Sequence, residues 1–358
     1  MKQRIIGFDL ARAYAIFGMY IVNFNMVFGH YNDQTFTGKF LSLFSGNSST
    51  VFVILAGMGI ALMTNRSEYS ISEKVNLRNT ILKRALFLFV GGLLLNFVWP
   101  ADILHFYGCY MFLAAFFIFL NRKIFLWLAT LSILVFHILI FIIPYETGWN
   151  LEKLQYNDFY TLNGFIRNTF YNGWNSIFPW IAYFLLGLFL GRLDWTQIKV
   201  QRKMFFTGLS LYLTINIIQI ISQQISISTQ LKEFINADYL PPFLPFILST
   251  FGFGLMLISG FMYLGIKVGE CKIAKTFAAT GQMTLTHYVS HVTIGMILFS
   301  VFTGKNLSED VSQMQATSPI YVLLFSIVYF VISYHFSRLW TIKHKNGPLE
   351  TLMRKLSS

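Results

Sequence analysis

Residues 124–144 read IFLWLATLSILVFHILIFIIP, a run without a charged residue that follows Arg122 and Lys123 and ends at Pro144. A helix rises 1.5 Å per residue, so about 20 apolar residues are needed to cross roughly 30 Å of hydrocarbon. The stretch therefore predicts a membrane-spanning helix.

Nine other apolar runs of similar length repeat this pattern along the chain. They are residues 8–28, 44–63, 79–98, 102–120, 174–192, 203–222, 241–266, 281–302 and 318–339. The composition is 55% hydrophobic, 18% aromatic and only 12% charged, which excludes an ordinary soluble domain. We predict an all-α, polytopic integral membrane bundle of about ten transmembrane helices, forming a single domain over residues 1–358.

The lysines and arginines fall almost entirely in every second link between these runs. If the N-terminus is cytoplasmic, all but six of the 27 basic residues lie at the cytoplasmic side. The exceptions are Arg12, Lys39, Lys153, Arg167, Lys232 and Lys305. The positive-inside rule then predicts that both termini are cytoplasmic. It also explains the net charge of +12 through contact with anionic membrane lipids, without a nucleic-acid partner.

Polar residues inside such spans are costly and so indicate function. Asp9 and Arg12 lie three residues apart on one face of the first span, where they can form an ion pair. The pair either anchors the helix at the interface or serves a site inside the bundle.

A second group lies at the exterior ends of the first and fourth spans, with Asn23 and His30 in one and Asp102 and His105 in the other. A carboxylate three residues before an imidazole can orient the ring and raise its basicity, as a general base requires. The alternative is that Asp102 only caps a helix after Pro100.

Two further groups of residues are a cluster of lysines and arginines and a pair of histidines. A basic cluster surrounds the second link, on the cytoplasmic side, and consists of Arg66, Lys74, Arg78, Lys83 and Arg84. The positive-inside rule accounts for such a cluster, and the same residues also suit the binding of a phosphorylated ligand. In the ninth span His287 and His291 are four apart on one face. No HExxH motif or carboxylate accompanies them, so we expect no metal and predict that they line a polar substrate cavity.

Several segments resemble known families. VWPADILHFYG (98–108), TGQMTLTHYVSHV (280–292) and NGPLETLMRKL (346–356) are similar to signature segments of the YeiB-like family of bacterial membrane proteins. FDLARAYAIFGMYIVNF (8–24) and FVILAGMGIAL (52–62) resemble the first two helices of the heparan-α-glucosaminide N-acetyltransferases and of acyltransferase family 3. In family 3 a histidine follows an arginine at the spacing that leads here from Arg12 to Asn23. In the glucosaminide acetyltransferases the catalytic histidine lies further on, in the exterior loop, where this chain has His30.

The resemblance implies a multi-pass enzyme of the bacterial plasma membrane. Such an enzyme moves an acyl group, typically acetyl, from cytoplasmic acyl-CoA to a hydroxyl or amine acceptor, such as a sugar or an envelope glycan or lipid, on the outer side. His30, His105, Asp102 and Asn23 would then be catalytic. Acyl-CoA would bind to the positively charged residues Arg12, Arg66, Arg78, Lys83 and Arg84.

Two other classes of membrane protein are compatible with the same sequence. Ten helices with a few intramembrane polar residues also suit a small-molecule or lipid transporter, although no inverted repeat is evident. A non-catalytic membrane subunit is the third, and a homodimer is compatible with each class. The exterior links 145–173 and 223–240 are aromatic-rich and predict either connectors on the lipid headgroups or a lid.

Overall fold

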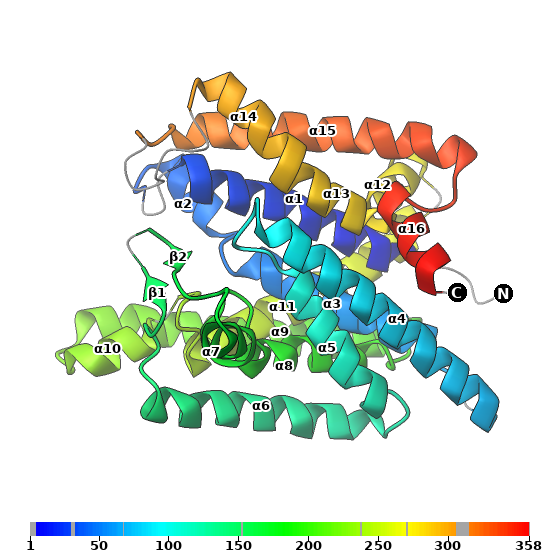
Figure 1. Ribbon diagram of the computed structural model, residues 1–358, viewed down its shortest axis with the longest axis horizontal. Helices are drawn as coiled ribbons and strands as arrows, with labels where there is room; N and C mark the ends of the chain where they lie inside the picture. Colours follow the sequence, from blue (N-terminus) through cyan, green and yellow to red (C-terminus); the bar gives the residue numbers. More distant parts are fainter. Residues whose placement is uncertain are drawn as a thin grey trace. The chain divides into compact units, whose positions relative to one another are not determined.

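The computed structural model describes residues 5–29, 33–66, 68–151, 153–236, 238–269, 271–305 and 315–357, and these are almost entirely helical (Figure 1). The α-helices are α1 (Ile6–Phe28), α2 (Phe36–Ser42), α3 (Asn47–Met63), α4 (Ile71–Asn96), α5 (Leu104–Phe117), α6 (Arg122–Ile142), α7 (Leu162–Arg167), α8 (Ile177–Leu190), α9 (Ile198–Gln224), α10 (Thr229–Ile235), α11 (Leu244–Val268), α12 (Lys272–Gln282), α13 (Thr284–Ser290), α14 (Met296–Thr303), α15 (Pro319–Lys343) and α16 (Pro348–Ser357). Two π-helical turns, η1 (Asn168–Asn172) and η2 (His291–Gly295), interrupt them, and strands β1 (Trp149–Asn150) and β2 (Gln155–Tyr156) form one antiparallel hairpin.

Within this described part, seven helical segments are long and apolar enough to cross a membrane. An eighth is a broken pair, Leu162–Asn172 and Ile177–Leu190, bent by 46°. The all-α membrane bundle is therefore confirmed, but a count of ten is not. The runs 8–28 and 102–120 correspond to α1 and α5, which lie outside these eight. Polar side chains lower the hydropathy of α1, and α5 is only 14 residues long. The side of the membrane on which the termini lie remains a prediction.

The chain forms two compact units, each assembled from separate stretches of sequence. Unit 1 comprises Met1–Phe52, Gln201–Phe205 and Leu255–Leu352, and unit 2 comprises Val53–Val200, Phe206–Gly254 and Met353–Ser358. The boundaries fall inside α3, α9, α11 and α16. Neither unit is therefore continuous in sequence, and the single domain over residues 1–358 stays a prediction.

In unit 1, α1 packs against α12, α13 and α15, and Figure 1 shows α15 running alongside α1. Glycines allow the close approach. A Cβ at Gly281 of α12 would overlap the carbonyl oxygen of Asp9, and one at Gly7 would overlap the backbone of α11 at Phe261. Small residues at helix contacts are typical of membrane bundles, where close van der Waals packing replaces the hydrophobic effect.

In unit 2 the closest pairs are α4 with α5 and α6 with α8. The α4–α5 pair is antiparallel, since Gly92 of α4 lies against His105 while Gly108 of α5 lies against Ala85 and Phe89. This pair carries one of the candidate sites, because Asp102 and His105 stand at the start of α5.

Candidate functional site

Asp102 and His105 form a fully buried pair at the start of α5. The Oδ1 of Asp102 accepts the backbone N–H of Leu104 at 3.0 Å, and its Oδ2 accepts the backbone N–H of His105 at 3.0 Å. The same Oδ2 lies 3.0 Å from the Nδ1 of His105. The carboxylate therefore caps the helix and also contacts the imidazole, and a catalytic role for the pair stays a prediction.

This contact fixes the tautomer of His105. A carboxylate that already accepts backbone N–H groups offers only acceptor positions, so the proton of the neutral ring lies on Nδ1. The Nε2 lone pair is then available. Among the described residues Nε2 is buried without a hydrogen-bond partner. Buried polar atoms are almost always paired, so an unpaired one requires an explanation such as a bound water, a ligand or a catalytic role.

The surroundings of His105 are apolar. Its ring centroid lies 3.8 Å from that of Phe106 and 6.0 Å from that of Phe159, and Gly92 of α4 leaves room for its backbone. Phe159 belongs to the exterior link 145–173, and it packs in turn on Phe165 at 5.5 Å. A segment predicted as a connector or a lid therefore covers the imidazole.

Arg167 helps to hold this covering segment in a defined conformation. Its Nη2 contacts both carboxylate oxygens of Asp158, at 2.7 and 2.5 Å, and its Nε donates to the hydroxyl of Tyr156 at 2.9 Å. Burial raises the pKa of Tyr156 to about 12, so the phenol stays protonated at neutral pH.

Asn172, in the π-turn η1, also holds this segment. Its Nδ2 donates to the carbonyls of Tyr145 and Thr147 at 2.7 and 2.8 Å, and its Oδ1 accepts the hydroxyl of Tyr156 at 2.7 Å. Sequence reasoning named neither Arg167 nor Asn172 as a site residue. The density of aromatic residues in the segment was the only signal there.

The basic residues of the second link lie on or just before α4, which also borders His105. Arg66 makes an exposed ion pair with Glu73 at 2.8 Å. Arg78 lies over the ring of Phe116 at 5.9 Å, and its buried Nε has no hydrogen-bond partner among the described residues. Lys83 is exposed.

Arg84 turns inward from the same helix. Its Nε donates to the hydroxyl of Ser357 at 3.3 Å, and its Nη1 lies 3.3 Å from the sulfur of Met63. The half-buried guanidinium and the unpaired Nε of Arg78 are donors of the kind that hold phosphate oxygens. That they bind the phosphates of CoA stays a prediction.

Arg12 belongs to unit 1. Its guanidinium lies 3.9 Å from Asp9 and 4.2 Å from the ring centroid of Phe8. Asp9 is buried and also accepts the side-chain amide of Gln282 at 3.2 Å. The expected ion pair therefore exists, and it stands where α1 meets α12.

Asn23 and the two histidines of the ninth predicted span form a buried chain of hydrogen bonds in unit 1. The Nδ2 of Asn23 lies 2.9 Å from the Nε2 of His291, whose Nδ1 contacts the carbonyl of His287 at 3.2 Å. The Nδ1 of His291 therefore carries the proton, and its Nε2 accepts from Asn23. His287 contacts the hydroxyl of Ser337 at 2.8 Å, and that hydroxyl donates to the carbonyl of Ser333. His287 is thus protonated on Nε2.

Aromatic and hydroxyl side chains extend this network. Tyr20 contacts Ser333 at 2.9 Å, and Tyr329 contacts Ser290 at 2.6 Å. The ring centroids of Tyr20 and His291 are 4.9 Å apart. The π-turn η2 begins at His291, and such turns occur frequently at functional sites. Sequence reasoning missed these tyrosines and serines, although Tyr329 and Ser333 are four apart on one face of an apolar helix.

Two sequence predictions stay open at this point. His30 lies outside the described residues. The substrate cavity predicted around His287 and His291 remains a prediction, and their imidazoles bond to different neighbours.

Two family models match the chain. The catalytic domain of heparan-alpha-glucosaminide N-acetyltransferase matches residues 4–226, and a family of proteins of unknown function, DUF418, matches residues 189–358. The first match covers more than half of the chain, so the chain belongs to this acetyltransferase family, and the two matches together confirm its resemblance to the YeiB-like proteins and to the glucosaminide acetyltransferases. A membrane acetyltransferase type of activity follows from that membership. No curated protein matches the chain.

Proposed function

We propose that this protein transfers an acetyl group from cytoplasmic acetyl-CoA to a hydroxyl or amine acceptor on the outer side of a bacterial plasma membrane. A sugar or an envelope glycan or lipid is the expected acceptor. The observation that carries the proposal is the buried Asp102–His105 pair with its unbonded Nε2. The family match supports acyl transfer over the alternative, a small-molecule or lipid transporter.

In the proposed reaction His105 is the general base. Its Nε2 removes the proton from the acceptor, whose oxygen or nitrogen attacks the thioester carbonyl. The carbon–sulfur bond then breaks, and the leaving thiolate of CoA takes the proton back from the imidazolium. Asp102 stabilises the imidazolium through its contact with Nδ1. The Phe159 ring keeps water away from the thioester.

The donor end of this site is the basic stretch of α4. Arg84 and Gly92 are eight residues apart on that helix, a rise of about 12 Å, and Gly92 adjoins His105. A donor whose phosphates lie near Arg78 and Arg84 would then extend its thioester along α4 toward the imidazole. In this proposal Arg66 and Lys83 attract the phosphates from the exposed end.

Asn23 and His291 are the second candidate site for the chemistry. There the Nε2 lone pair of His291 is already engaged by Asn23, so the imidazole becomes a base only if that bond breaks. The remaining amide hydrogen of Asn23 is able to stabilise an oxyanion. We therefore assign the base to His105, and Asn23, with Arg12 on the same helix, to a supporting role.

The test uses inside-out vesicles that contain the protein and are loaded with an envelope extract as acceptor. Labelled acetyl-CoA is added to the cytoplasmic face, and label inside the vesicle is measured. His105→Ala is expected to slow transfer by about 10² to 10⁴. His335→Ala, at an exposed histidine of α15, is the matched control and should keep the parent rate.

The same experiment separates the remaining candidates. If His105→Ala transfers acetyl at the parent rate and His30→Ala does not, the general base is His30, the histidine that the family resemblance indicates. Calorimetry with CoA tests the donor end: Arg84→Ala should weaken binding, whereas Arg122→Ala, at an exposed arginine of α6, should not. A parent that neither binds CoA nor transfers acetyl would refute the proposed function.

A further inference from the structure

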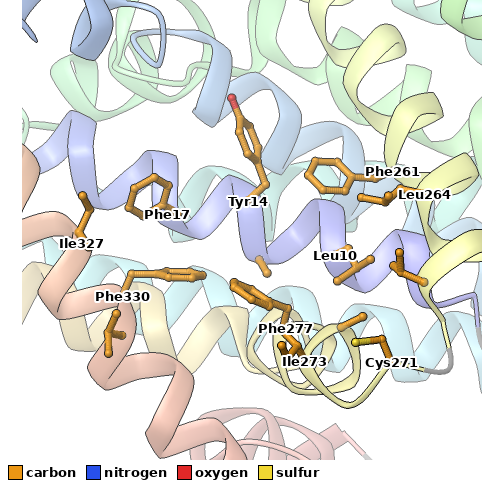
Figure 2. A pocket seen from close by; sticks show the side chains of 14 residues that line it. Leu10, Tyr14, Phe17, Phe261, Leu264, Cys271, Ile273, Phe277, Ile327 and Phe330 are labelled. Atoms are coloured by element: carbon orange, nitrogen blue, oxygen red, sulfur yellow. The ribbon is translucent and has the colours of Figure 1, made fainter.

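Unit 1 contains an apolar pocket that the proposed reaction does not use. It has a volume of about 580 Å³ and is lined by residues of α1, α11, α12 and α15 and by Cys271, the residue directly before α12 (Figure 2). Figure 2 shows Phe277 of α12 and Phe330 of α15 pointing toward α1, opposite Phe17 and Leu10. The two phenylalanine rings also approach each other, with centroids 5.9 Å apart.

The wall of this pocket offers almost nothing to a polar ligand. Of the fourteen lining residues, only Tyr14 and Cys271 carry a polar side-chain group, and the hydroxyl of Tyr14 points away from Phe277 and Phe330 in Figure 2. Pantetheine has two amides, and burying an unpaired amide is unfavourable by several kcal/mol. The pocket therefore suits a hydrocarbon chain and does not suit the arm of CoA.

One end of the pocket is electropositive. Val268, Cys271 and Ile273 form this end, where α11 stops and α12 begins. Lys267, Lys272 and Lys275 flank it with exposed side chains, and the sequence between them holds one acidic residue, Glu270. An apolar slot beside a basic surface complements a molecule with a hydrocarbon tail and an anionic head.

We propose that the pocket holds one hydrocarbon chain of an anionic membrane phospholipid, with the phosphate beside Lys272 and Lys275. The volume lies in the range of small-molecule sites. A partner helix, about 10 to 12 Å across with its side chains, does not fit such a slot. Basic residues at the cytoplasmic face attract anionic lipids selectively.

The lipid would also act on the buried network of unit 1. Phe330 forms part of the pocket wall and packs against Phe17 at 5.2 Å and Tyr20 at 6.3 Å. Tyr20 in turn bonds to Ser333. An occupied pocket therefore supports the helices that position Asn23 and His291, and lipid binding should raise the thermal stability of the protein.

The experiment is native mass spectrometry of the full-length protein, delipidated in detergent and then titrated with phosphatidylglycerol or with phosphatidylcholine of the same chains. We expect one tightly bound phosphatidylglycerol, preferred over phosphatidylcholine by about 30-fold if two lysines contact the headgroup. Bound lipid should also slow the reaction of Cys271 with a maleimide. Absence of lipid binding, equal affinity for both lipids, or an unprotected Cys271 would each overturn the proposal.

Two variants and one control locate the site. Lys272→Gln combined with Lys275→Gln changes only exposed side chains, and the preference for phosphatidylglycerol should disappear. Ala274→Phe puts a ring into the pocket and should abolish binding of both lipids. Lys199→Gln combined with Lys203→Gln removes the same charge from the exposed start of α9 and should change nothing. Parent-like lipid binding in the first double variant would refute the headgroup assignment even if Ala274→Phe fails to fold.

Discussion

Asp102→Asn separates the two roles of the aspartate, capping and orientation of the imidazole. Asparagine is as good a helix cap as aspartate, so a residue that only caps would tolerate the change. Asp102, however, accepts three hydrogen bonds, one through Oδ1 and two through Oδ2. Whichever way the amide lies, one of those positions becomes a donor.

Both orientations of the amide remove the carboxylate charge that stabilises the imidazolium. In one orientation the amide oxygen keeps both bonds to His105, and the nitrogen faces the N–H of Leu104, which loses its partner. In the other, the oxygen stays on the N–H of Leu104 and the amide nitrogen lies near His105. That nitrogen then faces the backbone N–H of His105 and loses this bond. It also donates to Nδ1, so the ring proton moves to Nε2 and the lone pair that would act as base disappears. We expect about 1 to 3 kcal/mol less stability from the lost bonds and a transfer rate lower by about 10² to 10⁴.

The assay is acetyl transfer in vesicles, with thermal unfolding of the same preparation. Asp194→Asn is the matched control. Asp194 accepts hydrogen bonds from Thr196 and Gln197, which lower its pKa, but it does so at an exposed turn without a histidine. It should keep the parent rate.

A parent rate in Asp102→Asn, with a stability loss as expected, would show that Asp102 is a cap and nothing more. The assignment of His105 as base would then fail with it. Equal losses of rate in Asp102→Asn and Asp194→Asn would mean that the assay reports folding instead of chemistry.

Three further results are expected. Gly92→Ala should destabilise the protein by about 1 to 3 kcal/mol or more in thermal unfolding, because its Cβ would overlap the backbone of α5. Gly91→Ala, whose Cβ would meet nothing within 4 Å, should leave the stability unchanged. Equal effects of the two substitutions would contradict the α4–α5 packing. Asn23→Ala leaves a buried imidazole nitrogen unpaired and should lower the free energy of unfolding by about 1 to 3 kcal/mol. An unchanged free energy of unfolding would show that this hydrogen-bond network does not stabilise unit 1. Backbone N–H groups at the start of α12 lower the pKa of Cys271, so its alkylation rate should rise with pH to a midpoint below that of an ordinary thiol and exceed that of half-buried Cys109; a midpoint at or above the ordinary value would contradict this.

The sequence predicted the membrane bundle well, because repeated runs of about 20 apolar residues do not occur in soluble domains. The count of ten spans was not reproduced at α1 and α5, for different physical reasons. The helix α1 forms over the predicted run 8–28, but polar side chains lower its hydropathy. The helix α5 starts only at Leu104 and ends at Phe117, since turns on both sides shorten an apolar run that looks continuous in sequence. The broken pair Leu162–Asn172 and Ile177–Leu190 was also not predicted, because its first helix lies in the link 145–173, whose polar residues interrupt the apolar pattern.

Local geometry in the candidate site was predictable, and distant geometry was not. Asp102 and His105 are three residues apart on the start of one helix, so their contact follows from helical spacing alone. The bond between Asn23 and His291 joins residues 268 positions apart, and the local sequence around neither residue predicts this contact. Phe159 likewise reaches His105 through a long link whose path depends on Arg167.

The π-turn η2 makes the packing of its helix on α1 depend on the number of residues between His291 and Phe299. His291 faces Asn23 of α1, and Phe299, eight residues later, packs on Phe28 of the same helix with ring centroids 4.6 Å apart. In an ideal α-helix eight residues leave the second side chain about 80° out of phase with the first, and the wide turn removes most of that difference. Deleting a single residue here, such as Thr293, would rotate Phe299 off α1 by about 100° without altering any contacting side chain. The spacing between the two contacts is therefore as much a determinant of this helix as the residues that make them.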